Sequence, residues 1–546
     1  MAALLMIVFS LWPSFLRGAV WQWSIKVNSV VSPETNKPPR AFLWIPPGCV
    51  RVRGVVVGQH NMLEEGILEH PDFRRELSAL GFAEVWITPG LDFVYNFEKG
   101  AGNAFDEMMH LLAEESGYKE LDSAPIAPIG HSAAASFPWN FAAANPQRTL
   151  AILSIKGDAP LTSMTGSGRP NPAWGERRID GIPGLMVMGE YEWLAGRLSP
   201  ATEFQKNHPK TPISVLCDAG HGHFDLTDPL VHFLALFLHK AAVQRLPAES
   251  APDKPVALKP ISPREGWLVD SGRITPPRVP AARFADYTGD RDEAFWAFDE
   301  ELAHAIENYG AQAWGKAPQL LGFSQNGRVV PQNPKTHAQV ALALPPLDEN
   351  LTFHLRGVFM DTVPAGNPEK WSGLAQGSPI SHSSDAEALQ VSRICGPVVQ
   401  TGPDTFAIRF YRMGLDNPRR TGDIWLLAHH PGDEKFKSAV QQANLRIPIK
   451  NTSGAPQTID FQGVPNQPRK TRSLQLHATS SAGLPVYFYV REGPAELEGD
   501  TLVLTEVPAR AKLPIKVTVV AWQWGRTTHP QIQSAEPIEQ TFTIGE

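Results

Sequence analysis

The residues of this chain best suited to covalent chemistry are a serine, an acid and a histidine that follow three separate strand-like runs. Ser132 lies in Gly130-His131-Ser132-Ala133-Ala134, Glu192 in Gly189-Glu190-Tyr191-Glu192, and His223 in Gly220-His221-Gly222-His223-Phe224-Asp225. A histidine can take the proton of a serine hydroxyl while a carboxylate orients the histidine and stabilises its cation. If the fold brings the three together, the serine oxygen can attack a carbonyl carbon.

The surroundings of Ser132 predict a sharp strand-to-helix turn. The run Pro125 to Ile129 is typical of a short buried strand, and Ala133 to Ala144 is typical of a helix. A serine on such a turn has an exposed hydroxyl, and only small neighbours let the strand and the helix approach closely enough. Ala134 stands where the motif G-x-S-x-G has its second glycine. Because alanine is also small, we predict that the turn still forms.

The segment around these residues alternates strand-like and helix-like runs from about residue 20 to residue 247. Such alternation predicts an α/β fold, with a doubly wound, mostly parallel sheet whose ligands bind at the carboxyl ends of the strands. Ser132, Glu192 and His223 all follow such ends. The expected strands are Trp23 to Val27 and Ala41 to Ile45 as an antiparallel pair, then Gly54 to Val57, Ala83 to Thr88, Leu150 to Ile155, Gly184 to Met188 and Ile213 to Cys217, and the expected helices include Phe73 to Leu80 and Pro229 to Ala242.

The chain order serine, acid, histidine resembles that of the α/β-hydrolase superfamily over about residues 20–245. The resemblance implies a serine hydrolase that needs no cofactor. It implies Ser132 as the nucleophile, Glu192 as the acid, because Gly189-Glu190-Tyr191-Glu192 matches the Gly-x-x-acid pattern, and a histidine from the last loop as the base.

The sequence leaves alternatives open for the acid and for the base. Asp158 follows the preceding strand, where some members of the superfamily place the acid, and Glu190 lies two residues before Glu192. We prefer His223 as the base, because Gly222 gives the backbone freedom to aim it inward. His221 is the alternative and is expected nearer the rim of the site.

Two backbone amides should stabilise the negative oxygen of the reaction, and losing one such donor costs about 3 kcal/mol. One is expected from Ala133, the residue after the nucleophile. The other is expected from the loop after Gly54 to Val57, where His60 and Asn61 are the candidates. The alternative for these two is a turn with local hydrogen bonds.

Three tryptophans fall in or beside segments that should surround the site. Trp139, Trp174 and Trp193 could stack on sugar rings as substrate-binding residues, or they could pack in the core. Structural packing is the commoner use of tryptophan, and the sequence leaves stacking on a sugar open.

The rest of the chain predicts β-rich units behind a linker. Residues 248–263 are rich in proline, residues 264–455 are strand-like with one helix near Asp292 to Asn308, and residues 456–546 contain only short alternating strands. The last unit resembles the bacterial immunoglobulin-like β-sandwich, through Ala478 to Val486 and Val519 to Gly525. Such repeats are usually spacers or docking modules, so we expect a chain ending near residue 455 to keep its chemistry.

Residues 1–19 predict an export signal, because an apolar run too short for an ordinary membrane helix precedes Arg17-Gly18-Ala19. We therefore expect a secreted or periplasmic protein with no membrane span after cleavage of the signal. The formal net charge of -7 gives no electrostatic basis for binding nucleic acid. The three cysteines, Cys49, Cys217 and Cys395, have no metal-type spacing, so neither a disulfide framework nor a metal site is expected.

Together these features predict an exported serine hydrolase of the carboxylic ester type (EC 3.1.1-like). An extracellular, decorated polysaccharide is the expected ester substrate, because an export signal precedes the hydrolase-like segment and β-rich units follow it. Two alternatives remain: a serine peptidase of the same fold, and a non-catalytic carbohydrate-binding or adhesion protein on a hydrolase scaffold.

Overall fold

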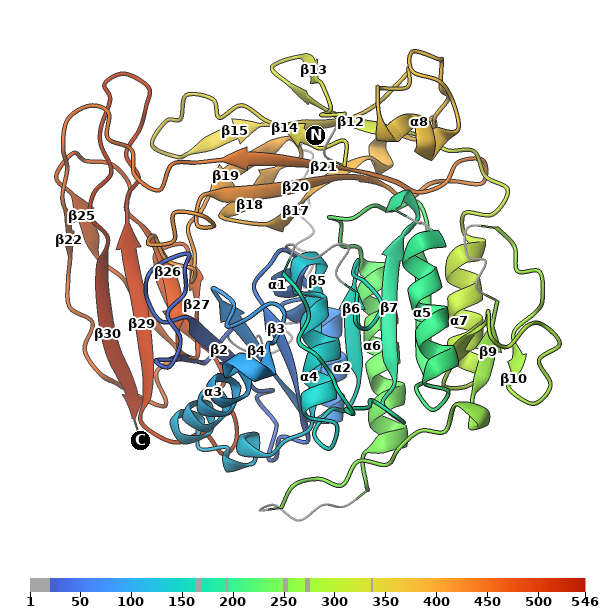
Figure 1. The fold of residues 1–546 in the computed structure, drawn as a ribbon. Helices are drawn as coiled ribbons and strands as arrows, with labels where there is room; N and C mark the ends of the chain where they lie inside the picture. Colours follow the sequence, from blue (N-terminus) through green and yellow to red (C-terminus); the bar gives the residue numbers. More distant parts are fainter. Residues whose placement is uncertain are drawn as a thin grey trace, which may run out of the picture.

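An eight-stranded sheet forms the centre of the N-terminal part of the computed structural model (Figure 1), in the order β1-β2-β4-β3-β5-β6-β7-β8. The first two strands pair antiparallel, and all pairs among the other six are parallel. Helices cover both faces, which explains why the inner strands are continuously apolar. The predicted α/β sheet is thus confirmed, with strands β1 Trp23–Lys26, β2 Arg40–Trp44, β3 Gly54–Gln59, β4 Phe82–Thr88, β5 Ile126–His131, β6 Ile152–Ile155, β7 Gly184–Gly189 and β8 Ile213–Asp218.

The structure describes residues 20–162, 169–192, 195–248, 254–270, 275–334 and 337–545. The predicted export signal, residues 1–19, lies outside them. Within the described residues, no helix is both long enough and apolar enough to cross a membrane.

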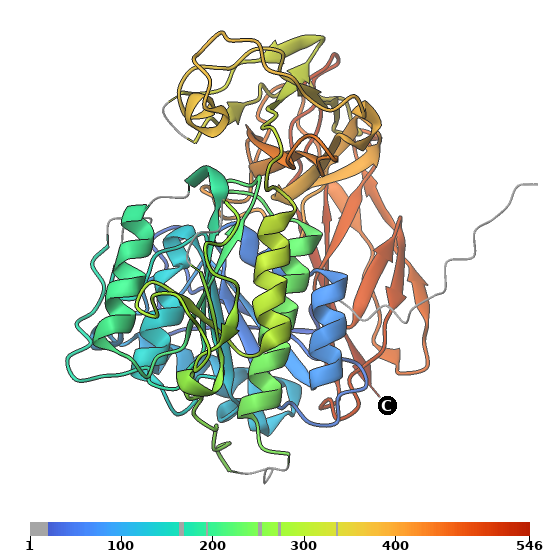
Figure 2. The same cartoon turned by 90° about the vertical axis from the view of Figure 1, so that its right-hand side faces the viewer.

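The helices divide between the two faces of the sheet, as Figure 2 shows edge-on. One face is covered by α1 Leu63–Leu68, α2 Pro71–Leu80, α6 Asp228–Arg245 and α7 Glu300–Ala311, and the other by α3 Ala101–Ser116, α4 Ser136–Ala144 and α5 Ala195–Asn207. The sequence predicted α2, α4 and α6 but not α1, α3 or α5.

The helix expected near Asp292 to Asn308 begins later than predicted. Phe295–Ala297 form strand β11, which pairs with β9 (Trp267–Val269), and the Asp299 side chain then accepts a hydrogen bond from the Leu302 amide as the N-cap of α7. Phe295, one of the apolar residues at helical spacing, therefore belongs to a buried strand.

Residues after the predicted linker pack on the α/β sheet rather than with the later strands. Ser214 in β8 donates a hydrogen bond of 2.6 Å to the Trp296 carbonyl, and Phe298, Leu302 and Ile306 belong to the core between α6 and the sheet. The small sheet β10-β9-β11, with β10 at Ala282–Arg283, and helix α7 thus extend the α/β unit beyond residue 264.

Residues 317–447, called here the cap unit, are β-rich, as predicted. Three small sheets enclose one apolar core, and a short helix, α8 (Asn367–Ser372), lies at their edge. The strands are β12 Leu321–Gln325, β13 Arg328–Val330, β14 Val340–Ala341, β15 Thr352–His354, β16 Arg356–Phe359, β17 Gln390–Cys395, β18 Val398–Gly402, β19 Thr405–Ile408, β20 Asp423–His430 and β21 Ala439–Arg446.

The C-terminal unit contains two larger sheets and a two-stranded one around a second β core. It is not an independent module, because Trp522 and Trp524 are buried in the core of the cap unit and Ile515 in that of the α/β unit. Truncation near residue 455 would remove these side chains from both cores, and the retained chemistry of the shorter chain stays a prediction. The strands are β22 Ile459–Phe461, β23 Gln467–Pro468, β24 Ser473–Gln475, β25 Ala478–Ser480, β26 Tyr487–Glu492, β27 Ala495–Glu498, β28 Thr501–Leu504, β29 Ile515–Trp522 and β30 Ile538–Gly545.

The cap unit lies over the edge of the sheet where the parallel strands end, above β5, β6 and β7 in Figure 1. Its side chains hold a fully buried carboxylate of α1: Glu65 accepts hydrogen bonds from Arg412 at 3.1 Å and Tyr411 at 3.0 Å, and Arg393 lies 3.4 Å away. Lys437 is 2.6 Å from Glu190, at the end of β7. Paired charges therefore fix the cap unit to the edge of the sheet where the parallel strands end.

We expect Glu65→Gln to loosen this attachment. Removing one partner from a buried ion pair leaves charge uncompensated and typically costs about 3 kcal/mol or more. Thermal unfolding should begin at a lower temperature, and limited proteolysis should separate the cap unit faster. Glu536→Gln is the matched control, since its pair with Lys450 is exposed and contributes less than about 1 kcal/mol. Equal behaviour of both variants would show that Glu65 does not fasten the cap.

Candidate active site

Ser132 lies on a strained turn between β5 and α4. Its φ is 51°, in the left-handed region that serine rarely adopts, and a single turn of 3-10 helix (Ser132–Ala134) leads into α4. Gly130 is needed at this turn, because a Cβ there would lie 2.1 Å from the carbonyl oxygen of Ala134. Ala134 itself is buried without opening the turn.

The three residues singled out in the sequence meet at the ends of β5, β7 and β8. Ser132 Oγ is 2.6 Å from His223 Nε2, and His223 Nδ1 is 2.6 Å from Glu192 Oε2. With the serine hydroxyl donating to Nε2, the Nδ1–H group must donate to the carboxylate. This geometry can pass the serine proton to His223 while Glu192 stabilises the resulting cation.

The carboxylate of Glu192 is held ionised by its surroundings. Burial alone would raise its pKa, but the neighbouring His223, the Arg197 guanidinium at 2.9 Å and Lys156 outweigh it and lower the pKa to about 2. Sequence reasoning missed Arg197, which α5 supplies. Since Glu192 stays charged at every ordinary pH, it can balance a cation on the histidine.

The alternative acids occupy other places at the same edge. Asp158 Oδ1 lies 3.5 Å from Arg197 Nε, behind Glu192. Glu190 accepts a hydrogen bond of 2.7 Å from the Gly220 amide and pairs with Lys437 of the cap unit. Neither is the carboxylate bonded to His223.

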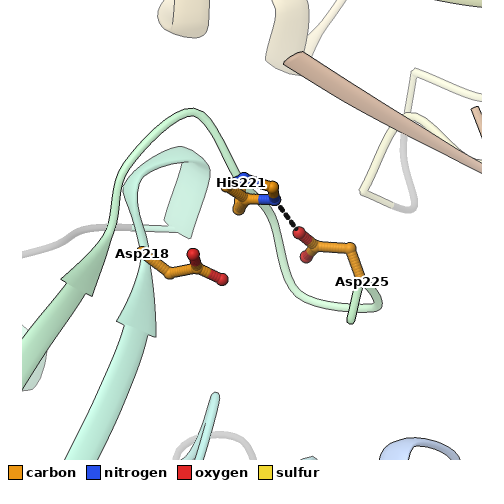
Figure 3. A group of neighbouring side chains, drawn as sticks. All are labelled: Asp218, His221 and Asp225. Atoms are coloured by element: carbon orange, nitrogen blue, oxygen red, sulfur yellow. Dashed lines mark hydrogen bonds and ion pairs between the residues drawn. The ribbon is translucent and has the colours of Figure 1, made fainter. Parts of the chain in front are cut away.

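His221 is buried, so the expectation that it lies near the rim of the site is wrong. Its Nδ1 pairs with Asp225 Oδ2 (Figure 3). Its ring stacks on that of His429 of the cap unit, with centroids 5.9 Å apart. The charges of Asp218 and Asp225 raise the pKa of His221 despite its burial. Gly220, with φ 76°, forms the left-handed turn in this loop, whereas Gly222, from which the sequence expected backbone freedom, has no positive φ.

Asp218, His221 and Asp225 have ligand atoms within 4.8 Å of one another, close enough to hold a metal ion. The fully buried Lys156 ammonium, however, is bonded to Asp218 and lies 3.5 Å from Asp225. The charges of Asp218 and Asp225 raise the pKa of Lys156 despite its burial, so the ammonium is charged. A protein cation thus already balances these acids, and the cluster serves to fix the loop that carries His223.

The two residues expected to supply the second amide of an oxyanion site, His60 and Asn61, occupy different surroundings in the structure. His60 is part of the core: its amide donates to the Ile87 carbonyl and its Nδ1 lies 2.9 Å from Thr88 Oγ1. Asn61 lies beside the turn, because its Nδ2 donates to the His131 carbonyl at 2.8 Å. The amide of Ala133 lies in the first turn after Ser132, where a helix leaves its leading amides without intrahelical partners.

Glu64, which the sequence did not single out, organises this region. Its carboxyl accepts hydrogen bonds from the amides of His131 at 2.6 Å, Met62 at 3.0 Å and Asn61 at 3.3 Å. Burial raises its pKa to about 7 in spite of these donors. The Asn61 amide is therefore directed toward Glu64, and Glu64 ties the loop after β3 to the end of β5.

His131 links the nucleophile to the base. Its Nε2–H donates to the His223 carbonyl at 2.8 Å, because a carbonyl oxygen can only accept. Burial and the neighbouring His223 lower the pKa of His131 to about 3, so the ring is neutral. The residue before the serine thus holds the backbone of the base.

Trp139 and Trp174 are core residues, which corrects their proposed use in substrate binding. Their side chains are 2% and 5% exposed, and their indole N–H groups donate to the Asp158 carbonyl and to Asn140. Both pack against the α4–α5 face, so they have no free surface for a sugar. Trp193 lies outside the described residues.

Aromatic residues of the cap unit lie over the candidate site instead. Trp425 of β20 stacks on Phe224, with centroids 5.4 Å apart, and Trp371 of α8 stacks on Tyr191 at 4.6 Å. Trp371 also donates to the Tyr191 carbonyl at 3.0 Å. Phe224 and Tyr191 adjoin His223 and Glu192, so the cap unit packs directly on the residues that carry the base and the acid.

The strand order, the two antiparallel leading strands and the serine on the turn after β5 together decide the fold. The N-terminal unit has the α/β-hydrolase fold. The predicted resemblance is confirmed for this unit at the level of fold, while the likeness of the C-terminal unit to immunoglobulin-like repeats stays a prediction.

Known proteins similar to this chain match its N-terminal unit. An S-formylglutathione hydrolase from Agrobacterium tumefaciens is 14% identical, with a TM-score of 0.30 over 40% of this chain and 94% of that chain. A Pyrobaculum calidifontis esterase is 17% identical, with a TM-score of 0.29 over 40% of this chain and 85% of that chain. A ferulic acid esterase from Anaeromyces mucronatus is 15% identical, with a TM-score of 0.29 over 41% of this chain and 91% of that chain. No protein-family model and no curated protein sequence matches the chain. At these scores we assign the fold from the strand order and the serine turn alone.

Proposed function

We propose that this protein is a serine hydrolase of carboxylic esters. The observation that carries the proposal is the chain of two 2.6 Å contacts from Ser132 through His223 to Glu192, on a left-handed turn at the carboxyl edge of the sheet. In the proposed reaction His223 takes the hydroxyl proton as Ser132 Oγ bonds to the ester carbon. His223 then returns the proton to the leaving alcohol.

The second half of the reaction regenerates the enzyme. His223 takes a proton from water, whose oxygen attacks the acyl-serine carbon, and the carboxylic acid leaves as Ser132 regains its hydrogen. The Ala133 amide is proposed as one donor to the negative oxygen of both intermediates. Besides the ester and water, both halves use groups of this chain.

The finer assignment concerns the substrate and its location. We propose that the ester is carried by an extracellular polysaccharide and that the protein is secreted or periplasmic. The support is the sequence of residues 1–19, which is typical of an export signal, and the β-rich units that follow the hydrolase unit.

A fluorophosphonate probe and a substrate panel test the proposal. We expect one covalent label, at Ser132, and turnover of at least one member of a panel of acetyl, feruloyl, methyl and uronoyl esters. A peptide series run in parallel separates an esterase from a peptidase of the same fold. A chain that takes no label and hydrolyses no substrate would instead be a binding protein.

A further inference from the structure

One side chain of the cap unit reaches the candidate base itself. The ring of His337 lies flat on the ring of His223, with centroids 5.1 Å apart and planes 15° apart. His337 also meets Phe224 edge-on at 5.2 Å. It is exposed, while His223 beneath it is buried. The His337 ring thus covers one face of the imidazole whose two nitrogens bond to Ser132 and Glu192.

The backbone that carries His337 is strained in a way that its own sequence does not favour. His337 and Ala338 have φ values of 48° and 53°, two consecutive residues with side chains in the left-handed region. Each such residue costs free energy of about 1 kcal/mol or more and persists only where its surroundings enforce it. Strain of this kind often accompanies a functional constraint.

Two buried glutamines enforce this conformation. Gln442 Nε2 donates to the His337 carbonyl and Gln441 Nε2 to the Ala338 carbonyl, each at 2.7 Å. Both glutamines lie on β21, in the body of the cap unit, and are nearly inaccessible to water. Gln441 and Gln442 thus together hold the short strained segment over the base.

We infer that His337 is a positioning residue of the active site, which packs on His223, keeps water from one face of its ring and holds that ring in line with Ser132 and Glu192. The inference rests on the proposed function and adds a residue from a different structural unit. It explains why the cap unit is fixed so firmly to the sheet edge, because a ring-on-ring contact depends on its exact placement.

The charged and titratable groups around the stacked pair set the expected dependence on pH. Burial, His223 and Arg197 lower the pKa of His337 and Glu192 opposes them, so His337 is neutral while His223 works. His131 also faces the base and is neutral. Without the His337 ring, water can solvate the imidazolium, which favours the protonated base. The acid limb of the pH–rate profile should then move to higher pH.

His337→Gly and His337→Phe test the inference together. Glycine removes the ring and also relieves the strain at φ 48°, so the protein should be at least as stable as the wild type. We nevertheless expect kcat/KM for p-nitrophenyl acetate to fall about tenfold and the acid limb of the pH–rate profile to move to higher pH. Phenylalanine keeps a flat ring and should retain the rate within about threefold.

His477→Ala, at an exposed position in the C-terminal unit, is the matched control and should change none of these values. Wild-type kcat/KM and pH profile in His337→Gly would overturn the inference while leaving the labelled serine, and so the proposed function, intact. A loss of stability in His337→Gly without a change in the rate of the folded enzyme would overturn it too. A wild type that takes no fluorophosphonate and hydrolyses no ester would overturn both proposals.

Discussion

Ser132→Ala is expected to abolish ester hydrolysis, with kcat lowered by about 10⁴-fold or more, and to abolish labelling by a fluorophosphonate. The hydroxyl is the attacking atom, and nothing else on the turn offers a nucleophile at hydrogen-bond distance from His223 among the described residues. Alanine occupies the same left-handed position with the same backbone strain, so the unfolding temperature should stay close to that of the wild type. Initial rates, mass spectrometry of the labelled protein and thermal unfolding measure the three quantities.

Ser136→Ala is the matched control, because Ser136 is the first residue of α4 and lies one turn beyond the nucleophile. This variant should keep both activity and label. Turnover by Ser132→Ala at the wild-type rate would remove the serine from the mechanism, however well the turn is formed.

His223→Ala and His221→Ala are expected to fail in different ways. Loss of His223 as the general base should lower kcat by several orders of magnitude, about as much as loss of Ser132, because the base and the nucleophile act as a unit. The free energy of unfolding of His223→Ala should fall only by the contribution of the lost side-chain contacts. The kcat of each purified variant and its thermal unfolding distinguish the two histidines.

His221→Ala should instead mainly affect stability. His221 is buried against Asp225, and without it Lys156 would be left to balance the charges of both Asp218 and Asp225. Breaking such a buried network typically costs about 3 kcal/mol, whereas kcat of the folded fraction should remain within about tenfold of the wild type. The opposite pattern, a stable but inactive His221→Ala and an active His223→Ala, would transfer the role of base to His221.

The local features of the site could be predicted because they depend on neighbours in the sequence. A short apolar strand, small residues at Gly130 and Ala134 and a following apolar helix are enough to form the turn that exposes Ser132. The order of serine, acid and histidine places them at the ends of parallel strands, and such ends share one edge of a sheet. The fold class and the edge that carries the chemistry therefore follow from the sequence.

The pairing of side chains at that edge depended on the tertiary structure. Glu192, Asp158 and Glu190 all reach the same edge. The Gly-x-x-acid pattern favours Glu192, but only the folded chain shows which carboxylate contacts the base. The structure separates them through partners from distant segments: Arg197 of α5 lies between Asp158 and Glu192, and Lys437 of the cap unit takes Glu190. His221 likewise turns inward because Asp225 and Lys156 form a buried charge cluster there.

The role of the later units was also beyond the sequence. For Trp139 and Trp174 the sequence left sugar stacking open beside core packing, because the depth of a tryptophan depends on how helices pack over strands. Both are in the core. The aromatic residues that cover the site come from residues 317–447, a region whose sequence predicted strands but no function. The sequence alone determined the sheet, the serine turn and the order of the reacting groups, since these are local patterns. Only the tertiary structure decided which acid and histidine pair and what covers them, because burial and charge pairing join segments far apart in the chain.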